Sequence, residues 1–438
     1  MNQLVIKMAF MKSALLVCIT AVAVLYLPNL WTKPLPLLIS GTTAPGFEQV
    51  LQLYRENFAN GVEYPIGGSA FSVYYKGSKV VDIWGGYADS EALRPWMENT
   101  MAVVFSTTKG VAATCMALLV DRGQLDYDRT VASYWPEFAQ EGKENITVRM
   151  LLGHEGGLSY TTRDITEELL GDQEALSQVL AESPPIWEPG TAHGYHALTF
   201  GLYASQLLRR ADPKHRTLGK FFKEEIAEPF GIDFFIGTPF ESFYRVGRLT
   251  GDISGIWSTL IKGLVDPMNR EMLVSMVTGK NKDIFTVLER YPLVALKNYR
   301  RAEVLALEQP SATGVGTARA VAKLYGVLAN GGQTIEGQRL LSEDIISKFI
   351  GESKAPSFDR SIGLETSFNL GYEITKIGGV EQFGHPGSGG MQGRADPQRK
   401  LSFGYVSSYH SPFGIGNDPR FSTLQKATYE CLNKLEGQ

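Results

Sequence analysis

Cysteine is scarce in this chain of 438 residues. The three cysteines, Cys18, Cys115 and Cys431, allow at most one intrachain pair, so disulfides do not define the fold. None lies beside a histidine or another cysteine at zinc-ligand spacing, which leaves a cysteine-based metal site without support. We predict neither a metal nor a cofactor. Cys115 lies in an apolar helical run, where a cysteine typically behaves as a small buried hydrophobe.

A strong excess of charge of either sign is also missing. Lys and Arg together number 42 and Asp and Glu 46, which gives a formal net charge of −4. No basic run is interleaved with aromatic residues, so we predict no nucleic-acid partner. In contrast, 44% of the residues are apolar and only 20% are charged, which indicates a globular chain with a large core.

One long uncharged run lies near the N-terminus. Lys7 and Lys12 precede the stretch 13–32, which is long enough to cross a bilayer. Trp31 and other large residues follow its apolar centre, which favours an uncleaved signal-anchor over a cleaved signal peptide. An organelle presequence is a third interpretation, against which the scarcity of arginine argues. We expect segment 1–32 to anchor the protein in a membrane with its body on the lumenal or extracellular side, or the protein to be secreted if this segment is cleaved.

Strand patterns occur near both ends of the chain, and helical periodicity dominates between them. The runs 70–75 and 80–84 flank a short turn and predict a β-hairpin. Further strand-like runs lie at 368–375, 390–395 and 401–408. Helical spacing is found at 109–121, 147–152, 173–181, 197–208, 317–329 and 421–435. We predict an α+β fold, an α/β sandwich in which an antiparallel sheet formed by N- and C-terminal strands packs against a mostly helical region.

The same patterns divide the chain into three parts. Residues 1–32 form the signal-anchor or signal segment, the proline-rich stretch 33–44 a connector, and residues 45–438 one domain. Within that domain, the stretch from about 231 to 310 mixes glycine, proline, aromatic and charged residues without a steady period. We interpret it as a loop-rich insertion or cap.

The first candidate for chemistry is the sequence Ser106-Thr-Thr-Lys109. If these residues open a helix, positions i and i+3 share a face, and the lysine amine can reach the serine hydroxyl. A serine hydroxyl needs such a base to become a nucleophile, and the lysine can act as one only when its pKa is lowered. The apolar residues 102–105 offer the necessary desolvation. Taken alone, the pattern also fits a serine cap with a solvent-facing lysine.

Two further motifs follow in order along the chain. Tyr195 lies between the turn 187–190 and the helical run that begins at Ala197, where its phenol could share a proton with Lys109 and Ser106. The glycine-rich stretch 383–390 then leads into an apolar run, and its glycines permit a bound substrate to approach the backbone closely.

Ser106-Thr-Thr-Lys109, Tyr195-His-Ala197 and His385-Pro-Gly387 resemble the three ordered motifs of the serine β-lactamase and penicillin-binding-protein family. The nearest relatives that they indicate are class C-like esterases and animal β-lactamase-domain-containing proteins. The segments 151–158, 187–190 and 395–397 add to the resemblance, which extends from about residue 45 to the C-terminus.

This resemblance implies a β-lactamase-like serine hydrolase domain over 45–438. It implies that Ser106 attacks a carbonyl to form an acyl-enzyme, with Lys109 and Tyr195 as the proton-transfer pair. The family's oxyanion hole would correspond to the backbone N–H groups of Ser106 and Ser388. His385 and Gly387 would then line the substrate pocket beside Tyr195.

Two departures from the family pattern concern β-lactam recognition. Ala197 stands where β-lactamases usually have an asparagine that helps to hold the β-lactam side chain. His385 opens the third motif, so the lysine that pairs with the carboxylate of the drug is absent. Both changes argue against β-lactam hydrolysis, and neither removes the nucleophile, its lysine or the tyrosine.

Other residues near the motifs have simpler interpretations. We expect His154, His193 and His196 to have packing or structural roles, although the last two could tune the pKa of Tyr195. The Ser388 hydroxyl is not in a Gly-x-Ser-x-Gly elbow, so we expect its backbone N–H to matter instead.

We therefore favour a serine hydrolase that acts on a small ester, an amide or a short peptide. The alternative is a catalytically weak or inactive descendant of the fold that serves as a binding or assembly module at a membrane. True β-lactam hydrolysis is a third possibility.

Overall fold

The computed structural model describes residues 35–437 apart from 65, 252–269, 272–273, 275–277, 279–282, 378 and 412–417. The chain divides into two compact units, Met1–Leu37 and Leu38–Gln438, and all elements described below belong to the second. The predicted anchor 1–32 lies outside the described residues. Among the residues that are described, no helix combines the length and the apolar character that crossing a bilayer requires.

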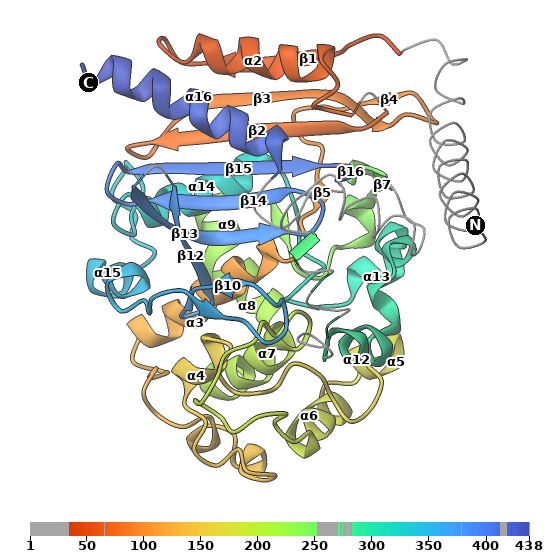
Figure 1. Ribbon diagram of the computed structural model, residues 1–438, viewed down its shortest axis with the longest axis vertical. Helices are drawn as coiled ribbons and strands as arrows, with labels where there is room; N and C mark the ends of the chain where they lie inside the picture. Colours follow the sequence, from red (N-terminus) through yellow and green to blue (C-terminus); the bar gives the residue numbers. More distant parts are fainter. Residues whose placement is uncertain are drawn as a thin grey trace, which may run out of the picture. The chain divides into compact units, whose positions relative to one another are not determined.

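A nine-stranded antiparallel sheet runs through this second unit (Figure 1). Its strand order is β1-β3-β2-β15-β14-β13-β12-β11, and β4 pairs with β3. The strands are β1 Ile39–Thr43, β2 Gly68–Tyr75, β3 Ser78–Asp89, β4 Arg94–Pro95, β11 Phe368–Asn369, β12 Tyr372–Ile377, β13 Val380–Gly387, β14 Met391–Asp396 and β15 Leu401–Ser407. Since β2 pairs with β15, N- and C-terminal strands share one sheet, and the predicted α+β class is confirmed.

The structure differs from the predicted strands in three places. Strand β1 lies inside the stretch 33–44 that we expected to be a connector, because its backbone pairs with β3 along the edge of the sheet. The predicted strand 368–375 is split into β11 and β12 by Leu370 and Gly371, which both have positive φ and form a tight turn. Strand β13 occupies most of the stretch whose sequence is merely rich in glycine.

Helices cover both faces of the sheet (Figure 1). The helices in the described part of the chain are α2 Glu48–Ala59, α3 Thr107–Asp121, α4 Val148–Leu152, α5 Glu167–Gly171, α6 Gln173–Glu182, α7 Thr199–Ala211, α8 Leu218–Phe222, α9 Glu228–Phe230, α12 Asp283–Arg290, α13 Ala302–Ala306, α14 Ala318–Ala329, α15 Glu343–Gly351 and α16 Pro419–Leu435. Helices α2 and α16 pack together on one face, while α3 and α14 contact the strands from the other. Two hydrophobic cores result, one on each side of the sheet.

Close backbone contact joins α14 to the sheet. A side chain at Gly404 of β15 would place its Cβ 2.2 Å from the carbonyl oxygen of Ala318 and 2.6 Å from the backbone nitrogen of Ala322. Only glycine permits this approach, which brings α14 against the strand. Tyr325 of α14 in turn lies against Gly110 of α3, where an added Cβ would be 1.9 Å from the phenol oxygen.

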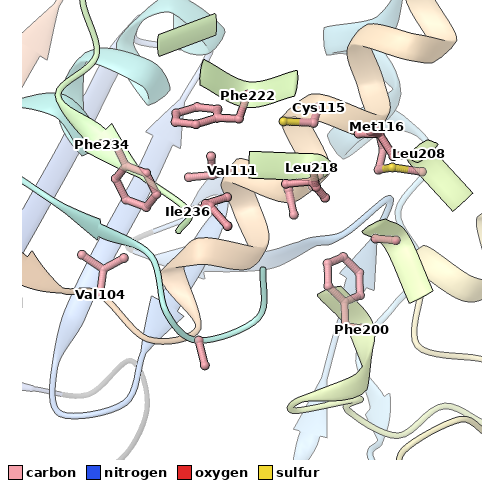
Figure 2. Close-up of a cluster of buried hydrophobic side chains, with 14 of the residues drawn as sticks. Val104, Val111, Cys115, Met116, Phe200, Leu208, Leu218, Phe222, Phe234 and Ile236 are labelled. Atoms are coloured by element: carbon pink, nitrogen blue, oxygen red, sulfur yellow. The ribbon is translucent and has the colours of Figure 1, made fainter. Parts of the chain in front are cut away.

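Helix α3 is buried around its whole circumference. Every residue from Thr107 to Leu119 is buried, as expected for a helix that is apolar on all sides rather than amphipathic. Figure 2 shows side chains of α3 packed among those of neighbouring helices and strands, labelled Val104, Val111, Cys115, Met116, Phe200, Leu208, Leu218, Phe222, Phe234 and Ile236. The predicted buried Cys115 is confirmed, and its thiol is free.

Short elements make up the described parts of the stretch 231–310. They include β6 Phe234–Phe235, β7 Thr250–Gly251 and three 3₁₀ turns. Strand β6 joins β5 Ala102–Val103 and β8 Val315–Gly316 in a small sheet. Just after β5, the Val104 N–H donates to the Gly314 carbonyl at 2.9 Å. This small sheet therefore holds the backbone immediately before Ser106.

Candidate active site

Ser106 lies at the N-terminal end of α3, directly after a residue in an unusual backbone conformation. Phe105 has φ of +48°, a region that bulky side chains rarely adopt. Its ring packs against Tyr299 with centroids 4.9 Å apart, and both rings are buried. Such local strain persists only where the surroundings over-determine the conformation. The sharp turn leaves Ser106 half-buried at the start of the helix.

The amine of Lys109 lies on the Ser106 hydroxyl. The distance from Nζ to Oγ is 3.1 Å, and Nζ also donates to the carbonyl oxygens of Ala197 at 2.6 Å and Ser311 at 3.0 Å. The side chain is fully buried, and this desolvation holds the pKa of Lys109 well below its usual range. A neutral amine has two N–H donors and one lone pair. With the donors used by two carbonyls, the lone pair is left for the Ser106 proton.

The two carbonyl acceptors were not predicted. In the sequence, Ala197 is notable only because it replaces the asparagine of the family motif. In the structure, its backbone oxygen accepts a hydrogen bond from Lys109. Ser311 comes from a distant stretch that packs on α7 at Gly201, whose N–H donates to Ser311 Oγ at 2.7 Å. An added Cβ on Gly201 would lie 2.5 Å from the Pro310 backbone, so this glycine permits the approach. No sequence pattern marks a carbonyl acceptor.

Tyr195 lies beside the amine, as its motif predicts. Lys109 Nζ is 4.8 Å from the centre of the tyrosine ring. Burial raises the pKa of Tyr195 well above its usual value, and the nearby Ser106 hydroxyl opposes this rise only in part. Within the described residues the phenol oxygen has no hydrogen-bond partner of ordinary geometry. Burial thus favours the protonated phenol, as it favours the neutral amine.

A buried carboxylate holds the backbone of Tyr195. Both oxygens of Asp359 accept from the Tyr195 N–H, each at 3.0 Å, and one of them also accepts from the N–H groups of Ser361 and Ile362 at 2.8 Å. Thr366 donates its hydroxyl to the other oxygen at 3.1 Å. Asp359 is fully buried. The sequence offers a weak sign of its turn, a Ser two residues and a Gly four residues after Asp359, but nothing links it to Tyr195.

Two of the neighbouring histidines are neutral acceptors in the interior. His154 Nδ1 accepts from the His196 N–H at 3.1 Å, and His196 Nε2 accepts from the Leu158 N–H at 2.7 Å. Burial lowers the pKa of His196 to about 3 and also lowers that of His154. His193 lies further out, with Nε2 2.9 Å from the Thr366 hydroxyl. These contacts match the packing roles that we expected.

His385 and Gly387 lie at the end of β13, next to the Ser106 segment. The His385 ring is 5.8 Å from that of Tyr195, and burial holds the pKa of His385 well below its usual range. A Cβ on Gly387 would be 2.2 Å from the Val104 carbonyl and 3.0 Å from the Thr107 hydroxyl. Gly387 thus allows the strand to lie against the residues that flank Ser106.

Ser388 lies just beyond β13, in the turn to β14, and is half-buried. Neither its backbone N–H nor that of Ser106 donates to any acceptor in the described part of the chain. Both donors are therefore available to a substrate oxygen. Arg420 holds the turn from behind, because its guanidinium donates to the Gly389 carbonyl at 2.6 Å and pairs with the buried Asp418.

Two other features bear on where the site lies. Among the described residues, no three His, Cys, Asp or Glu side chains are grouped as metal ligands would be. A hollow of about 630 Å³ lies elsewhere on the surface, between the turn at Gly77, α9 and the loop 333–338, and no candidate residue lines it. The site is therefore located by its side-chain geometry.

The sheet with its two helical faces, and a serine and lysine on a buried helix, invite comparison with known families. The family model described as beta-lactamase matches residues 54–423 of the chain.

The chain belongs to the beta-lactamase family.

Relatives of this beta-lactamase family member include the esterase/beta-lactamase LipL of Mycobacterium tuberculosis, which is 34% identical over 84% of this chain and 82% of its own. Among solved structures, a family VIII carboxylesterase is 34% identical with a TM-score of 0.78, over 90% of this chain and 99% of that one. A penicillin-binding protein homologue from Caulobacter crescentus is 33% identical with a TM-score of 0.76 over the same shares. The protein is thus an enzyme, a hydrolase with the β-lactamase fold.

We predict that Asp359→Asn lowers kcat/KM by roughly 10- to 100-fold, because an amide NH₂ would face backbone donors and displace Tyr195. Ester hydrolysis by the purified protein, with circular dichroism to verify folding, measures the effect. Asp344→Asn is the matched control, since Asp344 is an exposed residue that pairs with Lys348 on α15. An Asp359→Asn enzyme as active as the control would contradict a positioning role.

Proposed function

We propose that the protein is a serine hydrolase that forms an acyl-enzyme on Ser106, with Lys109 and Tyr195 as the proton-transfer pair. The observation that carries this proposal is the buried amine of Lys109, whose Nζ lies 3.1 Å from the Oγ of Ser106. The substrates that fit are small esters, amides or short peptides. The oxyanion hole consists of the N–H groups of Ser106 and Ser388, and His385 and Gly387 border the substrate pocket.

In the first half of the reaction, the Ser106 proton moves to Lys109 while Oγ bonds to the substrate carbonyl carbon. The carbonyl oxygen takes up the negative charge and accepts from the two backbone N–H groups, each worth roughly 2.7 to 4 kcal/mol of transition-state stabilisation. The bond to the leaving group then breaks, and the leaving oxygen or nitrogen takes the proton of the Tyr195 phenol. Lys109 returns its extra proton to Tyr195 and is neutral again.

In the second half, water attacks the acyl carbon and gives one proton to Lys109. The tetrahedral intermediate collapses, Ser106 Oγ leaves and recovers that proton, and a carboxylic acid is released. Within the protein, only the serine, the lysine and the tyrosine change their protonation states in these steps. The directions of the pKa shifts suit these roles, since burial favours the neutral amine and the protonated phenol.

The names of the relatives favour esters. LipL is described as an esterase/beta-lactamase, and the similar solved structure is a carboxylesterase. Ala197 and His385 lack the side-chain groups that would hold a β-lactam, which favours a simple ester further. The alternative function, an inactive binding or assembly module at a membrane, draws on these same two changes, but a buried lysine amine on a serine hydroxyl has no evident use in it.

A fluorophosphonate probe tests the proposal, because it reacts with activated serines. We expect the parent protein to be labelled and the Ser106→Ala variant to remain unlabelled. Ser388→Ala is the matched control and should still be labelled, since its hydroxyl is not the proposed nucleophile. A well-folded parent that takes up no label would favour the inactive module.

The pH dependence of kcat/KM should report the ionisation of Lys109. Only the neutral amine accepts the Ser106 proton, so activity rises with pH through the pKa of Lys109 and then levels off. Because burial lowers this pKa, the plateau should be reached well below the range of an ordinary lysine, about pH 10. A pH–rate profile at constant ionic strength measures it. Activity that still rises tenfold per pH unit near about pH 10 would contradict a neutral Lys109.

We also propose that the N-terminal segment anchors the enzyme in a membrane, with the hydrolase on the lumenal or extracellular side. The uncharged stretch 13–32 motivates the proposal, and Asn145 of the sequon Asn145-Ile-Thr147 is exposed. When the full chain is expressed in eukaryotic cells, it should stay in the membrane pellet after a carbonate wash. It should also lose mass on deglycosylation, whereas the Asn145→Gln variant should not. Release of the protein by the carbonate wash would contradict membrane anchoring. An unchanged mass after deglycosylation would contradict a lumenal or extracellular hydrolase domain.

A further inference from the structure

A serine and a histidine form a hydrogen-bonded pair next to the candidate active site. The Oγ atom of Ser388 is 2.8 Å from Nε2 of His410, and either atom can be the donor. The proposed mechanism uses the backbone N–H of Ser388 and leaves both side chains without a role. His410 has no distinguishing sequence pattern, because it lies in the run Ser-Tyr-His-Ser without a motif.

The His410 imidazole touches both segments that supply the oxyanion hole. It belongs to β16 Tyr409–His410 and is 7% exposed. Its ring stands edge-on to Phe105, the residue before Ser106, with centroids 5.4 Å apart and an interplanar angle of 83°. On the other side, a Cβ on Gly389 would lie 2.6 Å from His410 Cδ2, so the imidazole also lies against the turn that carries Ser388.

This turn needs external support. Gly389 and Gly390 both have positive φ, and glycine restricts its own backbone least of all residues. Catalytic donors act only when they are held within about 0.5 Å of the productive geometry. Arg420 fixes the carbonyl of Gly389 from one side. The bond from Ser388 Oγ to His410 fixes the residue whose N–H faces the oxyanion.

We propose that His410 is a positioning residue for the oxyanion hole, which acts through the Ser388 side chain to aim the Ser388 backbone N–H at the substrate oxygen. The proposal rests on the proposed function, because it assigns a role within the same reaction. The imidazole joins the two donor segments, with ring packing on Phe105 and a hydrogen bond to Ser388. Its loss should weaken binding of the transition state more than binding of the substrate.

Three single variants separate the hydrogen bond from the ring packing. Ser388→Ala removes the bond, His410→Phe keeps a ring against Phe105 but removes Nε2, and His410→Gln removes the ring but keeps a polar group within reach of Ser388. We expect Ser388→Ala and His410→Phe each to lower kcat by about 3- to 10-fold with KM little changed. His410→Gln should recover most of kcat. Hydrolysis of a soluble nitrophenyl ester by the full chain provides both constants.

The double variant Ser388→Ala/His410→Phe decides whether the two side chains act as one unit. If they do, its kcat is no lower than that of the worse single variant. Three outcomes would each overturn the proposal. They are a double variant whose loss of kcat is the product of the two single losses, a kcat that falls as far in His410→Gln as in His410→Phe, and an unchanged kcat in Ser388→Ala. Fluorophosphonate labelling of the parent distinguishes failure of this proposal from failure of the proposed function. If the parent is labelled but the variants have unchanged kcat, only the role of His410 is refuted. If the parent is not labelled, the proposed function is refuted.

Discussion

The site depends on keeping an uncharged amine inside the protein. An ammonium group buried without a counter-ion loses several kcal/mol of hydration, so the burial of Lys109 lowers its pKa and favours the neutral amine. The surroundings suit the neutral form, because two carbonyl oxygens accept its two N–H groups and, in the part of the chain that the structure describes, no carboxylate hydrogen-bonds to it. This arrangement requires a helix that is enclosed on every side. The apolar character of α3 is therefore a chemical requirement as well as a packing one.

Around that amine, most of the site consists of backbone groups held by side chains from elsewhere. Asp359 holds the N–H of Tyr195, and Arg420 holds the carbonyl of Gly389. The side chains that differ from the β-lactamase pattern, at Ala197 and His385, are not among these supports. Under the proposed mechanism, substrate recognition can therefore change at those two positions while these backbone supports are retained.

Local periodicity made part of the fold predictable. The hairpin β2–β3 and the helices α3 and α14 follow from apolar spacing of two or of 3.6 residues. Strand β13 escaped detection because its end contains glycine, histidine and proline, which weaken any strand pattern. Strand β1 is a short edge strand with alternating exposure. It is a strand because its backbone pairs with β3, and its own composition does not indicate one.

The candidate site was predictable where a motif carries it. The three motifs point to Ser106, Lys109 and Tyr195 through residue types and order alone, and the fold brings Lys109 against both of the others. Asp359, Ser311 and His410 could not be found in this way. Each contacts a partner at least 22 residues away in the sequence. A carboxylate on an amide, a carbonyl on an amine and an imidazole on a hydroxyl produce no periodic sequence pattern.

The pairing of β2 with β15 joins Tyr75 to Leu401, so the sheet closes between segments separated by most of the chain. On the ribosome, the hairpin β2–β3 is complete long before its neighbour has been made. Until then β2 presents an open edge, a template for unwanted strand addition. Contacts of such long range also slow folding. The strand order thus delays completion of the sheet. A nascent chain of this protein would benefit from a chaperone that covers the open edge of β2.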